Sequence, residues 1–196
     1  MAGEIVEIAK KLREIVDRLE ALTKQPDQPE AIANDPLAAE MDVAEAEWRG
    51  DMKKQAELQA KVAAQQATED EKRELSYMPY RITHKEEHIT DICFQQHARR
   101  SVTTDTEGYR VLLEMFTTTT NLRYLATVRN PDAVRRKRIE KERSAGEQAI
   151  ARDTELLKKK AGVDAQAVVD SFFAWLKDKT TEQQLSAFRA GAAGTP

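Results

Sequence analysis

The sequence is poor in the residues on which cross-linked and turn-rich proteins depend. Its 196 residues include one cysteine, Cys93, so a small disulfide scaffold is excluded. Seven glycines and six prolines amount to about 7 % of the chain, compared with roughly 12 % in average proteins. That shortage excludes collagen-like and Pro/Gly-rich disordered chains, and it argues against an all-β sandwich, which needs many turns.

Aromatic residues and long apolar runs are scarce as well. Aromatic residues make up 6 % of the chain, and its longest apolar runs, such as 172–176, fall far short of the ~18 residues of a membrane span. Residues 1–11 contain Glu4 and Glu7 and no apolar stretch, so we expect no secretory signal. The single cysteine fits a reducing compartment. The sequence therefore predicts a protein without a membrane span that is cytoplasmic, or assembled in the cytoplasm into a larger particle.

Charge is abundant but unevenly distributed. Charged residues make up 33 % of the chain, and the formal net charge is −3. Residues 1–128 hold 17 basic and 24 acidic side chains, whereas residues 129–160 hold 11 basic and 6 acidic ones. A basic block thus follows a long acidic region, and it is the main electrostatic asymmetry of the chain.

Helix-start signals recur along the chain and predict an all-α fold with about seven helices. Asp35 before Pro36, and Asn130 before Pro131, are typical of a cap followed by the first helical residue. Three Thr-x-x-Glu capping boxes follow the same logic: Thr68 to Glu71, Thr83 to Glu86 and Thr104 to Glu107. The first box predicts a short helix that ends at Pro79, and the second predicts a new helix to about residue 100.

The third capping box predicts the most hydrophobic helix, which we expect to be central. Its threonine run at 117–120 weakens the helix propensity and leaves a strand open as an alternative. A sparsely apolar helix follows from Pro131 to about residue 161, where Gly162 ends it. Asp164 and Thr180 then begin two further helices.

An isoleucine- and leucine-rich seam runs through residues 4–23. Its apolar residues alternate at spacings of three and four: Ile5, Ile8, Leu12, Ile15, Leu19 and Leu22. This heptad spacing predicts a coiled-coil-like helix. Two interpretations stay open, which are packing on the chain's own bundle and association with another copy or a protein partner.

All three histidines lie close to the single cysteine. His84, Glu87 and His88 match the H-x-x-E-H pattern of inverted zinc proteases. On a helix, these three and Asp91 share one face, which could bind a metal ion. The competing interpretation is a solvated helix surface with Cys93 in the core. A protease would need a further ligand and a substrate cleft, so we expect no metal and no cofactor, and these four residues remain a weak alternative.

The start of the 131–161 helix is strongly basic. Its cationic residues are Arg135, Arg136, Lys137, Arg138, Lys141 and Arg143. They could neutralise phosphates of a nucleic acid. Glu140 and Glu142 are interleaved with them, and Tyr124 is the one nearby aromatic residue that could stack on a base. A solvated helix with ion pairs four residues apart, or an acidic protein partner, explains the block equally well.

Aromatic residues gather near the C-terminal end of the sequence. The cluster comprises Phe172, Phe173, Trp175 and Phe188. Phe172 and Phe173 point to different faces of a helix, so one face could pack on the chain's own bundle while the other binds a partner protein.

These patterns divide the chain into six segments. They are a heptad helix at 1–24, a Pro-rich linker at 25–35, a helical core at 36–130, a long charged helix at 131–161, an aromatic helical hairpin at 162–190 and a disordered tail at 191–196. A P-loop, a G-x-G-x-x-G motif and a G-x-S-x-G motif are all missing, and no small-molecule substrate is evident. We therefore expect a non-enzymatic structural or adaptor protein with protein partners or self-association, in a larger assembly such as a phage or bacterial particle. A nucleic-acid-associated regulator and a metal-binding helical protein are the alternatives.

Overall fold

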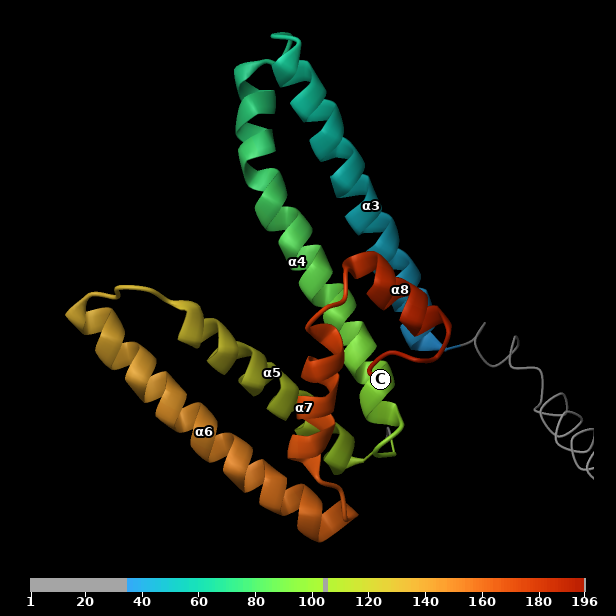
Figure 1. Ribbon diagram of the computed structural model, residues 1–196, viewed down its shortest axis with the longest axis vertical. Helices are drawn as coiled ribbons and strands as arrows, with labels where there is room; N and C mark the ends of the chain where they lie inside the picture. Colours follow the sequence, from blue (N-terminus) through green and yellow to red (C-terminus); the bar gives the residue numbers. More distant parts are fainter. Residues whose placement is uncertain (1–34, 104–105, 196) are drawn as a thin grey trace, which may run out of the picture. The chain divides into compact units, whose positions relative to one another are not determined.

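The computed structural model describes residues 35–103 and 106–195, which form six α-helices and no strand (Figure 1). The helices are α3 Pro36–Ala63, α4 Glu69–Arg99, α5 Glu107–Thr127, α6 Ala133–Ala161, α7 Ala165–Leu176 and α8 Thr181–Arg189. The all-α class is confirmed, and the helix number is close to the expected one. In the described ranges, no helix has the length and apolarity that crossing a membrane requires.

The chain divides into two units, Met1–Ala39 and Glu40–Pro196. The first is described only at residues 35–39, where α3 begins. There Asp35 Oδ1 accepts a hydrogen bond from the backbone N–H of Leu37 at 3.0 Å, which confirms the predicted cap before Pro36. The heptad seam at 4–23 and residues 25–34 of the linker lie outside the described residues. The helices discussed below belong to the second unit.

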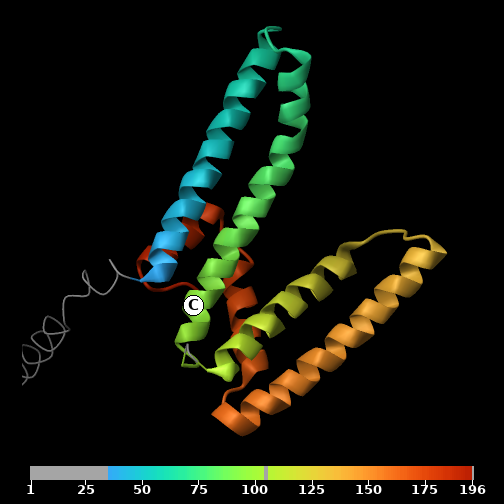
Figure 2. The same cartoon turned by 180° about the vertical axis from the view of Figure 1, so that it is seen from behind.

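Two helical hairpins and two short helices make up the second unit. α3 lies beside α4, and α5 packs along α6 (Figures 1 and 2). α7 contacts α4, α5 and α6, and α8 lies on α4. The core forms where α4, α5 and α7 meet. There the rings of Phe94 and Phe116 stack at 4.0 Å, and Phe172 meets Phe94 edge-on at 5.1 Å.

Polar side chains bridge α3 to α4 along the whole first hairpin. Trp48 Nε1 donates to Glu86 Oε1 at 3.3 Å, and Arg81 Nη2 donates to Asp51 Oδ1 at 2.6 Å. Lys61 pairs with Glu71 nearer the turn. Buried apolar residues on α3, including Met41, supply the rest of the contact surface. Hydrophobic burial therefore stabilises this hairpin, and the polar pairs fix how its two helices face each other.

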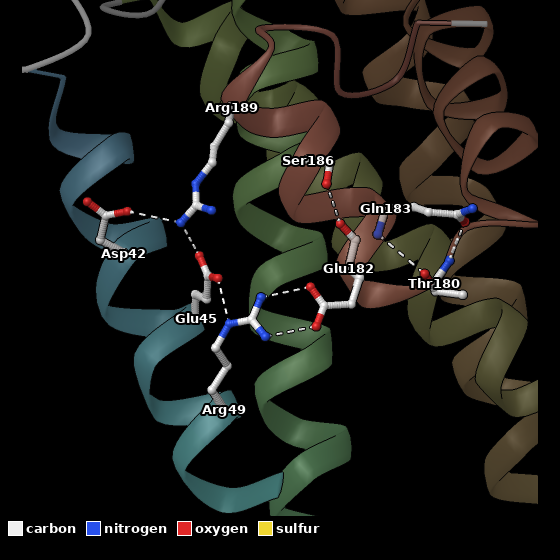
Figure 3. Close-up of polar contacts among 8 residues, drawn as sticks. All are labelled: Asp42, Glu45, Arg49, Thr180, Glu182, Gln183, Ser186 and Arg189. Carbon is white, nitrogen blue, oxygen red and sulfur yellow. Dashed lines mark hydrogen bonds and ion pairs between the residues drawn. The ribbon is translucent and has the colours of Figure 1, made fainter. Parts of the chain in front are cut away.

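A second polar network connects α3 to α8 (Figure 3). Arg49 donates two hydrogen bonds to the carboxylate of Glu182, at 2.9 and 2.8 Å, and a third to Glu45 at 2.7 Å. Glu45 is buried and also pairs with Arg189, which approaches Asp42 at 3.7 Å. A buried carboxylate thus lies between two guanidinium groups, which compensate the cost of removing it from water.

The expected break at Pro79 is wrong, because α4 continues through this proline. The capping box at Thr68 and Glu71 is confirmed, whereas the second box at Thr83 begins no helix. Pro79 is exposed, so its ring and missing N–H face solvent. The neighbouring Met78 and Ile82 are buried. Burying two such side chains stabilises by roughly 3–6 kcal/mol, which offsets the ~3 kcal/mol cost of an interior proline.

The threonine run at 117–120 is helical and forms no strand. Each of its four hydroxyls donates to the carbonyl four residues earlier, at 2.8–3.1 Å. The side chains therefore satisfy their own polar groups within the helix. α5 begins two residues later than expected, because Thr106 is its cap.

The remaining helix ends follow the sequence signals closely. Asp132, two residues after Asn130, caps α6, and Gly162 ends this helix in the left-handed conformation at φ 65°. Asp164 caps α7, and Thr180 forms a capping box with Gln183 at the start of α8.

Residues 191–195 differ from the disordered tail that was expected. Ala193 is fully buried, and its carbonyl accepts a hydrogen bond from Arg100. Arg100 also donates to the carbonyl of Gly191 at 2.7 Å, and Gln96 accepts from the Ala193 N–H at 3.2 Å. Small residues let this segment approach α4 closely, where polar side chains of α4 pair with its backbone.

Candidate functional site

The C-terminal aromatic cluster is part of the chain's own core. Phe172, Phe173, Trp175 and Phe188 are all buried, and the first three pack against the rings of α4 and α5 or against one another. The aromatic cluster therefore packs on the chain's own helices, which was one of its two interpretations; the other was the binding of a partner protein. The ring of Phe173, on the other face of α7, is covered by the guanidinium of Arg123 at 3.9 Å.

The histidine-rich segment of α4 does not assemble a metal site. No three His, Cys, Asp or Glu side chains in the described ranges are placed to hold a metal ion, so His84, Glu87, His88 and Asp91 do not form a ligand set. His88 Nε2 instead lies 3.6 Å from Glu40 Oε1 on α3. Partial desolvation by the surrounding protein raises the pKa of Asp91. Cys93 is buried as expected, and burial raises the pKa of its thiol to about 12.

A serine and a histidine do meet, between α4 and α7. Ser171 Oγ lies 3.3 Å from His97 Nε2, a pair that sequence spacing did not indicate. His97 Nε2 also faces the carbonyl of Val168 at 3.1 Å, and Arg100 Nη2 faces its Nδ1 at 3.1 Å. Ser171 Oγ donates its proton to the Val168 carbonyl at 2.9 Å. The serine proton is therefore directed at the backbone and not at the imidazole, and the pair is a structural contact.

The basic block lies at the start of α6, beside the end of α5. Residues 123–143 hold eight basic and three acidic side chains. Arg138 Nε donates to Glu142 at 2.7 Å, and this carboxylate raises the pKa of Arg138. Arg143 lies 3.8 Å from Glu147. Arg135, Lys137 and Lys141 are exposed and have no ion pair with the described part of the chain.

Two adjoining hollows open between α5 and α6 at this end. Each has a volume of about 430 Å³. They share Tyr124, Leu125 and Glu142. The first continues towards Gly146, and the second continues past Ile139 to Arg135. We call the two hollows together the α5–α6 groove.

The floor of the α5–α6 groove is apolar and only half covered. Leu122, Leu125, Val128 and Ile139 are each intermediate in exposure. Tyr124 stands at its edge with 65 % of its surface exposed. Residues 117–152 contain no buried side chain, whereas Phe116 and Leu157 on either side of this stretch are buried. The sequence predicted that the whole hydrophobic helix after the third capping box is central. That prediction therefore holds only for the first half of α5.

We call residues 117–152 the hairpin end. In both views it extends past α4, α7 and α8, and no other described helix lies along it (Figures 1 and 2). Two antiparallel helices alone leave one side of their shared seam open to water. The apolar floor of the α5–α6 groove is half covered and has basic side chains at one end. Exposed apolar surface with a polar rim is typical of a site that contacts another macromolecule.

Sequence reasoning found the basic half of this site and missed the apolar half. The spacing of Leu122, Leu125 and Val128 was visible, but it was assigned to the core. These residues line an open groove and not the core because α7 covers the first half of α5 and leaves the second half uncovered. The spacing along α5 alone does not show how far α7 reaches.

A comparison with protein-family models, curated proteins and solved structures finds no match to this chain.

Proposed function

We propose that this chain is a non-enzymatic structural or adaptor protein that makes protein–protein contacts within a larger assembly. The observation that supports this most is the hairpin end, where 36 consecutive residues, 117–152, contain no buried side chain. Isolated helix pairs without a third layer are marginal in water. A partner that covers the α5–α6 groove would supply the missing layer.

The heptad seam at 4–23 supports a second contact of the same kind. Its narrow a/d spacing suits pairing with another copy or with a partner helix. Light scattering of the full chain over a concentration series tests this part. Self-association predicts a mass above the 22.2 kDa of one chain, and Leu12→Glu with Leu19→Glu should return it to that value.

Affinity capture from the cells that express the protein tests the contact at the hairpin end. Tyr124→Glu places a charge at the edge of the groove, and Tyr80→Glu is the matched control, since Tyr80 is 74 % exposed on α4. The proposal predicts that proteins captured by the wild type and by the control are lost from Tyr124→Glu. A monomeric chain that captures the same proteins as the wild type and as both variants contradicts it.

A nucleic-acid-associated role is the second candidate. It is supported by the exposed basic residues Arg135, Lys137 and Lys141, which no described carboxylate neutralises. A salt titration of DNA and RNA binding tests it. Binding at low salt that weakens steeply as salt rises would favour this role, and the lack of binding at low salt would remove it.

A further inference from the structure

We infer that the α5–α6 groove binds an amphipathic helix of a partner protein, one whose apolar stripe is flanked by carboxylates. The inference rests on the proposed function and specifies the chemistry of the partner. It is based on three features that lie along the α5–α6 groove: a half-covered apolar floor, the exposed Tyr124 and the unpaired Arg135.

The shape of the groove suits a helix. Its α5 wall includes Thr118, Asn121 and Leu125, which follow one another at helical spacings of three and four. Its α6 wall repeats the pattern in the opposite direction at Gly146, Glu142 and Ile139. The furrow runs from about residue 118 to residue 128, or about 15 Å at 1.5 Å per residue. A third helix of about three turns laid along two antiparallel helices completes a common bundle geometry.

The charges at the basic end of the groove select a carboxylate-bearing partner. Arg135 and Arg138 line this end. Glu142 already pairs with Arg138, so Arg135 is the cation that is left for a partner group. Arg135 lies in the first turn of α6, close to Arg138 at the same end of the groove. An acidic residue beside the apolar stripe of a docked helix would meet these groups.

The same charges disfavour two other occupants. A second copy that presented the same face would place two basic hairpin ends against each other. A nucleic acid would contact the cations but leave Leu125, Val128 and Ile139 with nothing apolar to cover them. Tyr124 is the one aromatic side chain that lines the groove, which makes a poor platform for successive bases.

Fluorescence anisotropy with the full chain tests the inference. The probe is a labelled peptide of three heptads with Leu at positions a and d and Glu at the flanking e and g positions. The control peptide has Lys at those flanking positions. We expect the acidic peptide to bind at least about tenfold more tightly than the basic one, as a few oriented ion pairs allow.

Two double variants of α6 separate docking in the groove from general attraction to positive charge. Arg135→Glu with Arg138→Glu reverses charges that line the groove. Lys137→Glu with Lys141→Glu makes the same change in charge on the same helix, at exposed positions that line neither hollow. A glutamate at position 135 lies three residues after the cap Asp132, where a negative charge favours the helix, so the first variant should fold.

The inference predicts that only the 135/138 variant weakens binding of the acidic peptide, by about tenfold. Equal binding of both peptides, no binding of either, or equal losses in both double variants would overturn it. So would tight binding of duplex DNA that both variants reduce alike. If the peptide test fails while capture from cells still depends on Tyr124, the partner chemistry is wrong and the adaptor role stands. If capture fails as well, the adaptor role fails.

Discussion

At the scale of single residues, His97 shows how the C-terminal segment is held. Its ring is mostly buried among Phe94, Phe172 and Ser171, and Arg100 approaches its Nδ1. Burial, followed by the positive charge of Arg100, lowers the pKa of His97. The neutral imidazole is therefore the form that fits the folded chain.

This arrangement predicts a pH dependence of stability. The unfolded chain takes up a proton on His97 near pH 6.5, whereas the folded chain resists it until its lower pKa is reached. Between these two pKa values the unfolded state binds more protons, so the free energy of unfolding decreases as the pH falls below about 6.5. Urea denaturation at about pH 7.5 and 5.5 measures this change, and His97→Gln should reduce it. Equal pH dependence in the wild type and in His97→Gln would contradict the prediction.

A single methyl group added at Gly194 should lower the free energy of unfolding strongly. The φ of Gly194 is 75°, and an added Cβ would lie 2.3 Å from Nδ1 of His97. Gly191 has a similar φ of 67° but nothing within 4 Å of that position. We expect Gly194→Ala to lower the free energy of unfolding by about 2–4 kcal/mol, and Gly191→Ala by about 1 kcal/mol, which is the backbone strain alone. Equal losses in urea denaturation would show that residues 191–195 do not pack on α4 as described.

At the scale of elements, the helices were predictable where local chemistry decides them. The caps at Asp164, Thr180 and Gly162 are local hydrogen-bonding and backbone effects, and the sequence shows them directly. Pro79 was misjudged because burial of Met78 and Ile82 by other helices outweighs its local cost. Tertiary contacts of this kind leave no local sign in the sequence.

A substitution at Pro79 tests directly whether buried neighbours offset the cost of this proline. Replacing it with alanine restores a backbone N–H in α4 and removes the ring from the preceding turn. Because the residue is exposed, no packing is lost, and Pro79→Ala should raise the free energy of unfolding by about 1–3 kcal/mol in urea denaturation. An unchanged or lower value would contradict the explanation that burial of Met78 and Ile82 offsets a local cost of this proline.

Half of the candidate site was predictable from the sequence, and the other half was not, because it depends on tertiary contacts. A run of arginine and lysine is visible in any sequence, and its exposure follows from charge. Whether Leu125 belongs to a core or to an open groove depends on which helix lies opposite, and α7 covers only the first half of α5. The buried state of Phe173 likewise depends on Arg123 and Phe116, which are distant in sequence.

At the scale of the whole chain, the described residues combine a well-packed centre with a long hairpin, α5–α6, whose outer end is uncovered. Buried aromatic residues concentrate where α4, α5 and α7 meet, and ion pairs connect α8 to α3. The scarce aromatic residues of the sequence are thus mostly used to hold these helices together. Tyr124 is an exception, because it lies exposed at the edge of the α5–α6 groove.

Hydrogen–deuterium exchange of the full chain, alone and with the acidic peptide, tests the role of the hairpin end most directly. In the free protein, amides of 117–127 and 133–152 should exchange faster than those of 109–116, because fewer buried contacts hold them. Addition of the peptide should slow exchange in 117–152 and leave the α3–α4 hairpin unchanged. Uniformly slow exchange in the free chain, or protection that appears elsewhere, would contradict the role proposed for this surface.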